Sequence, residues 1–192
     1  MYVNPFCITL LVMTLCIPAS VNSETRVTTD VDTRLLHSRQ AVKMFADALI
    51  AELRYAMEEG GPERAIKVCH IEAPQIARDV SDTHKWQVGR TSLRYRNPDN
   101  APDAWEETVL QQFEQRKAQG EDISKLEYAE DTAAGYRYMK AIPTKPLCLA
   151  CHGENLGEEV QATLKEYYPN DNATGFKVGD IRGAFTILQP NK

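Results

Sequence analysis

The pentapeptide Cys148-Leu149-Ala150-Cys151-His152 constrains this chain more than any other stretch. Two thiols three residues apart, followed at once by an imidazole, are what covalent attachment of haem requires. In such a motif the cysteines form thioethers with the two vinyl groups, and the histidine ligates the iron. The motif predicts one covalently bound haem c, attached through Cys148 and Cys151, with His152 as an iron ligand.

Other uses of paired cysteines fit this stretch less well. A structural zinc site needs four Cys or His ligands in paired clusters, and the sequence has neither a second C-x-x-C nor an H-x-x-x-H. A thioredoxin-like redox pair has no role for the adjacent histidine. At average Cys and His usage, a chance C-x-x-C-H in a chain of this length is on the order of one in a thousand. Haem is therefore the predicted cofactor.

The N-terminus carries a short apolar segment. Residues 6–17 (FCITLLVMTLCI) are too few to span a bilayer comfortably, and Val21 and Ser23 are small residues of the kind that suit signal peptidase. Residues 1–23 are therefore predicted to be a cleaved secretory signal, which implies a periplasmic or otherwise exported protein. No Lys or Arg precedes the apolar run, so an uncleaved anchor or a lipid tether stays the alternative.

Five cysteines occur in the sequence, and their uses can be counted. Cys7 and Cys16 lie in the signal, and Cys148 and Cys151 belong to the haem motif, so Cys69 remains. A lone thiol in an exported protein is buried, intermolecular or a ligand. A six-coordinate haem needs a second axial ligand, and no methionine follows the motif to supply it from downstream. Seven residues remain open for that role: Cys69, His70, His37, His84, Met44, Met57 and Met139.

Length and charge exclude several classes of partner. The chain has 192 residues, enough for one ordinary domain, and a formal net charge of −5. That charge argues against nucleic acid and anionic membrane surfaces. No second apolar run predicts a membrane span after signal cleavage.

Hydrophobic periodicity predicts helices first and a sheet afterwards. Apolar residues between 35 and 57 recur at helical intervals, Gly60-Gly61 ends that helix, and Pro62 starts a second helix with Cys69 on its inner face. Pro74 is expected to restart a short helical segment. Further helices are predicted near 103–119 and 157–167. Strands are predicted over 86–96, 125–130 and 135–142 and at the end of 175–188.

This order of elements is typical of an α+β fold. Residues 24–61 are predicted to be a lead-in and a long N-terminal helix, and residues 62–192 the haem c domain. The long helix either packs on its own core or forms a homodimer interface.

Three arginines, Arg90, Arg94 and Arg96, alternate along the first predicted strand. Alternating charges usually form the solvated face of a strand. Haem, however, carries two propionates, and Arg is the residue best shaped to pair with a carboxylate. Any of the three is therefore a candidate propionate partner.

A set of ordered motifs resembles a bacterial family of monohaem c-type domains with a PAS-like fold, long catalogued as a domain of unknown function. The motifs are Ala65-Ile66 with Cys69 and Ala73-Pro74, then Gly89 to Arg94, Arg96 to Asn100, Trp105-Glu106, Cys148 to Gly153, Tyr168 to Asp171 and Gly179 to Ala184. The resemblance implies a PAS-like central antiparallel sheet flanked by helices. It also implies iron held by His152 and Cys69. Family members occur as free exported proteins and as sensory input modules.

A thiolate ligand stabilises ferric iron and lowers the reduction potential. The function expected from the resemblance is therefore redox or diatomic-gas sensing, with CO or NO as ligand, or redox relay to a protein partner. A small periplasmic electron-transfer cytochrome is the alternative. An enzyme, such as a peroxidase or reductase, is not favoured, because a six-coordinate haem offers a substrate no open site.

Overall fold

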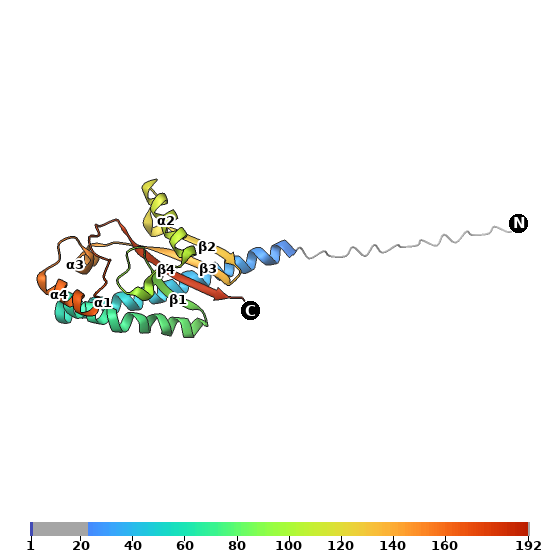
Figure 1. Ribbon diagram of the computed structural model, residues 1–192. Coiled ribbons are helices and arrows are strands. Elements are labelled where there is room, and N and C mark those ends of the chain that lie inside the picture. Colours follow the sequence, from blue (N-terminus) through green and yellow to red (C-terminus); the bar gives the residue numbers. More distant parts are fainter. Residues whose placement is uncertain (2–22, 192) are drawn as a thin grey trace.

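Four antiparallel strands form the centre of the fold (Figure 1). The computed structural model describes residue 1 and residues 23–191, and side chains from residue 33 onward; the predicted signal lies almost wholly outside the described residues. The sheet order is β1-β4-β3-β2. The strands are β1 Gln87–Thr91, β2 Glu127–Thr132, β3 Gly135–Pro143 and β4 Ile181–Pro190. The predicted α+β plan, a central antiparallel sheet flanked by helices, is confirmed.

The long N-terminal helix α1 (Ser23–His84) is a helical hairpin in two halves. Gly60 (φ −168°, ψ 24°) and Gly61 (φ 67°, ψ −163°) leave the helical conformation, and the positive φ of Gly61 is one that glycine adopts without strain. The chain reverses there, so that the second half returns beside the first (Figure 1). Ala41 and Phe45 of the first half and Val80 of the second half therefore meet in one core. The predicted break at Gly60-Gly61 is confirmed.

Three local predictions are wrong. Residues 24–30, expected as a lead-in, are helical, because backbone hydrogen bonds extend a helix without an apolar face. Pro74 lies inside α1 rather than restarting it. The buried neighbours Ala73 and Val80 hold that half against the sheet, which outweighs a proline penalty of about 3 kcal/mol. Strand β1 stops at Thr91, because the Ser92 N–H donates to the Asn100 carbonyl instead of continuing the ladder.

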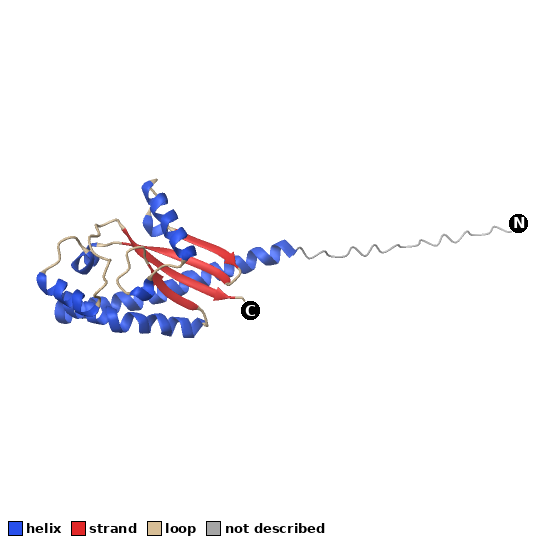
Figure 2. Cartoon of the chain, viewed as in Figure 1, coloured by secondary structure: helices blue, strands red, loops and turns tan. Residues whose placement is uncertain are grey.

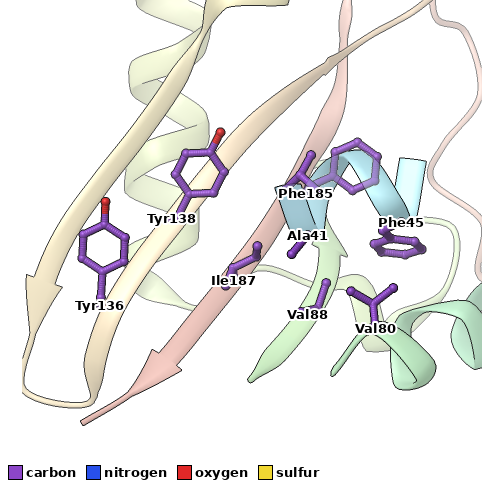
Figure 3. Packing of buried hydrophobic residues seen from close by; sticks show 9 residues of the cluster. Ala41, Phe45, Val80, Val88, Tyr136, Tyr138, Phe185 and Ile187 are labelled. Atoms are coloured by element: carbon purple, nitrogen blue, oxygen red, sulfur yellow. The ribbon is translucent and has the colours of Figure 1, made fainter. Parts of the chain in front are cut away.

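The two faces of the sheet are covered differently. Helix α1 covers one face, where Tyr136 and Tyr138 of β3 and Phe185 of β4 pack with residues of both helix halves (Figure 3). Helix α2 (Ala104–Ala118) packs on the other face and begins with a capping box between Asp103 and Glu106.

Short elements complete the fold at the end of the sheet where β3 leaves it (Figure 2). They are the 3₁₀ helices Pro98–Asn100, Ile123–Lys125 and Pro146–Cys148, with α3 Leu149–His152 and α4 Glu158–Tyr167. Within the described part of the chain, no helix combines the length and apolarity that crossing a membrane requires.

Candidate haem-binding site

A cavity of about 650 Å³ is bordered by the two halves of α1, the sheet, the loop before α2 with the first turn of α2, and the segment that carries the pentapeptide. Cofactor sites in proteins occupy roughly 300–1,000 Å³, so the cavity has the size of a cofactor pocket. Cys69, Cys148, Cys151 and His152 all border it. The fold therefore brings Cys69 of α1 to the same cavity as the three motif residues that follow β3 in the sequence.

His152 is held in the form that can bind a metal. Its Nδ1 lies 2.6 Å from the Ala173 carbonyl oxygen, which only accepts hydrogen bonds, so Nδ1 carries the proton and Nε2 keeps its lone pair. Burial lowers the pKa of His152 well below its usual value, and the charges of Arg182 and Arg96 lower it further. The imidazole is therefore neutral. The Phe176 ring packs edge-on against it, with ring centroids 6.2 Å apart.

The two motif cysteines lie on a tight helical turn. The 3₁₀ helix Pro146–Cys148 runs directly into α3, so both thiols and the imidazole are presented within about two turns. Burial raises the pKa of Cys151 to about 11, and its Sγ lies 3.9 Å from the Pro62 carbonyl oxygen at the start of the second half of α1. Cys148, Cys151 and Cys69 are free thiols.

Arg96 fixes the position of this turn. Its guanidinium pairs with Asp171 at 3.0 Å and donates to the carbonyls of Cys151 (2.6 Å) and Ala173 (3.3 Å). Ala173 is the residue whose carbonyl accepts from His152. One buried arginine therefore ties the motif to the loop that orients the imidazole.

Cys69 lies in the second half of α1, where Ile66 of the same half packs against α4 residues Val160 and Leu164. Burial raises the pKa of the Cys69 thiol, while the nearby Arg90, Arg96 and Arg182 oppose that shift. Coordination to a cation deprotonates a thiol outright, so a raised pKa does not prevent ligation.

Five of the other six candidates for the second axial position do not border the cavity. His37 and Met44 are exposed on α1, His70 packs against the rings of Tyr167 and Tyr168, His84 stacks on Trp86, and Met139 is buried in the core against α2. Met57 borders the cavity, as Cys69 does. Of the seven candidates for the second axial ligand, Cys69 and Met57 are therefore the two that border the cavity.

The three arginines predicted as propionate partners differ in their positions relative to the cavity. Arg90 borders the cavity. Arg94 is exposed, stacks on the Phe176 ring at 4.0 Å and lies outside the cavity lining. Arg96 borders the cavity but is occupied by Asp171.

A fourth arginine, Arg182, borders the cavity and was missed from the sequence. Alternation along β4 would place Arg182 on the same face as Ala184, toward α2. The register shifts near Ile142 and Pro143, so that Ile181 and Ala184 both enter the core against α2 and Arg182 points to the cavity. Gly183 permits this bulge: its φ is +151°, and a Cβ there would lie 2.4 Å from the Thr91 carbonyl oxygen. An arginine beside a glycine within a predicted strand was the available signal.

The residues at the cavity fit a haem. A neutral imidazole offers a free Nε2, two thiols flank it at the spacing that thioether formation needs, and a third thiol borders the same space. Arg182 also leaves its buried Nε without a hydrogen-bond partner among the described residues, as a site for an anionic group would. Fold and site together define the chain as a haem-binding protein with an α+β fold.

Comparison with known proteins agrees with this class. The family model described as "Tll0287-like: Tll0287" matches residues 19–190, and the chain belongs to that family. A solved structure, the crystal structure of the cyanobacterial heme-protein Tll0287, is 28% identical, with a TM-score of 0.66 over 83% of this chain and 96% of that one. No curated protein matches the sequence.

Proposed function

We propose that this chain is an exported monohaem c-type protein that senses redox state or a diatomic gas, or relays a redox signal to a partner. Cys148 and Cys151 attach the haem, and His152 and Cys69 ligate its iron. The observation that carries the proposal is the meeting of three thiols and one neutral imidazole at a single cofactor-sized cavity. Membership in the family of a heme-protein supports haem binding.

When bound, the haem supplies a one-electron couple and, if an axial ligand leaves, a coordination position for CO or NO. The chain supplies the control of that chemistry. His152 stays attached because the Ala173 carbonyl holds its orientation and the motif holds its backbone. Cys69 is the replaceable ligand, because it reaches the cavity from a different helix.

A thiolate at Cys69 favours ferric iron and gives a low reduction potential. Reduction adds negative charge to a buried site, which raises the affinity of the thiolate for a proton. If Cys69 took up a proton and left the iron, the haem would offer that position to a diatomic ligand. We expect Cys69 to be the residue at which such sensing would occur.

The test begins with the purified holoprotein. A pyridine haemochrome spectrum typical of two thioethers is expected, together with a low-spin ferric electron paramagnetic resonance spectrum of His/thiolate type. Haem that acid and acetone extract would refute covalent attachment. A bis-His, His/Met or high-spin ferric spectrum would refute thiolate ligation.

Two matched variants separate the axial candidates that the cavity offers. Cys69→Ser should produce a high-spin ferric haem and raise the potential, whereas Met57→Leu should leave both unchanged. The reverse pattern would assign the ligand to Met57. A ferrous protein that binds CO supports the sensor; a ferrous spectrum unaltered by CO supports the electron carrier.

A small electron-transfer cytochrome is the second candidate, and one observation favours it. Leu147, next to Cys148, is 38% exposed and also borders the cavity. The attachment edge of the haem would then lie near the surface, as docking to an electron donor requires. Rapid electron exchange with small redox dyes, without any response to CO, would support this function.

A further inference from the structure

Arg90 carries a charge that the described protein does not neutralise. It extends from β1 to the cavity, and its guanidinium makes no ion pair or side-chain hydrogen bond with the described residues; the titratable groups that act on it are Cys69 and Tyr168 rather than a carboxylate. The aromatic neighbour is Phe45, whose ring centroid is 5.8 Å from the Arg90 Cζ. Burial lowers the pKa of Arg90. A buried cation without a partner is costly, so its presence indicates an anion in the cavity.

Arg182, on the adjacent strand β4, also borders the cavity. Its Nη1 donates long hydrogen bonds to the Ser92 hydroxyl (3.4 Å) and the Arg94 carbonyl (3.3 Å), but within the described chain it has no carboxylate partner. Its Nε is buried and unpaired. Burial, together with the charges of Arg96 and Arg90, lowers its pKa to about 9, so Arg182 is still a cation at neutral pH.

We propose that Arg90 and Arg182 hold the two haem propionates, inside the cavity and against the β1 and β4 strands. This inference rests on the proposed function, because it requires the haem at the cysteine-lined cavity. Two guanidinium groups that have no carboxylate partner among the described residues match two carboxylates in number and sign. Arg94 and Arg96 are excluded from this role, since the first lies outside the cavity and the second is paired with Asp171.

The charge balance links this arrangement to redox chemistry. The two guanidinium charges cancel the two propionate charges, and a Cys69 thiolate cancels the positive charge of the ferric porphyrin core. The buried ferric site is then neutral, and the ferrous site carries one uncompensated negative charge. Removing either arginine adds one negative charge to both states, which makes the acceptance of an electron harder.

The experiment compares Arg90→Gln and Arg182→Gln with Arg94→Gln, which removes the same group outside the cavity. Redox titration should show a lower potential in the first two, with the ferric-to-ferrous ratio at fixed potential raised at least tenfold, equal to about 59 mV for a one-electron couple. Their resonance Raman spectra should show a shifted propionate bending band. Arg94→Gln should leave potential and band at the wild-type values.

Lysine variants at the same two positions provide a second test in case the glutamine variants misfold. Arg90→Lys and Arg182→Lys keep the charge, so each should recover most of the potential while the propionate band stays altered, because the paired hydrogen bonds are lost. An unshifted band in both glutamine variants overturns the proposal. So does a change confined to the thiolate signals of the paramagnetic resonance spectrum, which would make Cys69 the partner of these arginines. Absence of covalent haem in the wild type would instead refute the proposed function.

Discussion

Replacing Arg96 by Met tests whether one buried ion pair holds the haem motif in place. The Arg96 and Asp171 side chains are only 9% and 10% exposed, and the pair is 3.0 Å apart. Arg96→Met leaves the Asp171 carboxylate buried without its cation and leaves the Cys151 carbonyl without its 2.6 Å hydrogen bond.

The size of the effect follows from that burial. Breaking a buried pair by removing one partner costs about 3–5 kcal/mol, because the remaining charge is uncompensated. For a chain of this size, each kcal/mol lowers the melting temperature by roughly 2–4 °C, so a fall of roughly 6–20 °C is expected. Lys43→Met is the matched control: its pair with Asp47 is 75% and 65% exposed, and such helix pairs contribute about 0.3–0.5 kcal/mol.

The assays are thermal and chemical denaturation of the ferric holoprotein, each followed by far-ultraviolet circular dichroism and by the haem absorption. Arg96→Met with Asp171→Asn should be more stable than Arg96→Met alone, because the amide leaves no buried charge and still accepts from the Ala173 N–H. A single variant that loses less than about 1 kcal/mol, or a double variant no better than the single one, refutes the reasoning.

Three further predictions concern the framework around the site. Phe45→Ala removes a side chain that is 1% exposed and packs edge-on against Phe185 at 5.4 Å; denaturation should show a loss of about 3–5 kcal/mol, and a loss below about 1 would contradict this packing. Gly183→Ala places a Cβ against the Thr91 carbonyl at a φ that alanine resists, so β1 should lose hydrogen-exchange protection. Gly157→Ala, which has open space around it and a φ of −62°, should leave β1 protected. The hydrogen bond from Arg39 lowers the pKa of Glu127, with Tyr138 adding to it and burial opposing it. A carboxyl group whose pKa is lower in the folded protein than in the unfolded chain stabilises the fold at pH values above its unfolded pKa. The difference in unfolding free energy between wild type and Arg39→Met should therefore be full above about pH 4.5 and shrink below it. A difference that stays constant across pH 3–7 would refute the assignment.

Four of the residues that the sequence proposes for the haem site lie at one cavity, and their roles in attachment and ligation stay predictions. Cys148, Cys151 and His152 form a contiguous motif, and the spare thiol Cys69 was found by counting. All four border the cavity. Export, covalent attachment and a homodimer through α1 stay predictions.

The positions that could not be predicted from the sequence depend on strand register and on contacts between residues that are distant in the sequence. Arg182 points to the cavity only because β3 and β4 shift register, and no local pattern reports a pairing between distant strands. Met139 and Met57 are equivalent as sequence, but one lies in the core against α2 and the other at the cavity. Pro74 is a helix breaker by propensity, yet tertiary contacts of its neighbours decide otherwise.

We expect the cavity to couple haem binding to the stability of the fold around it. Its lining combines the charged Arg90 and Arg182 with the apolar Phe45, Ile66 and Phe185, and the space is partly open to solvent. Without haem, water would contact apolar side chains that the cofactor would otherwise cover, which favours closure of the space. Without haem, the second half of α1 should therefore collapse inward or separate from the sheet. In a Cys148→Ala, Cys151→Ala variant prepared without haem, hydrogen exchange should accelerate in residues 62–84 and α3, while the part of α2 that carries Val109, Leu110 and Phe113, which pack on the opposite face of the sheet, keeps its protection. Equal acceleration throughout the chain, or none, would show that the cavity does not set the stability of the hairpin.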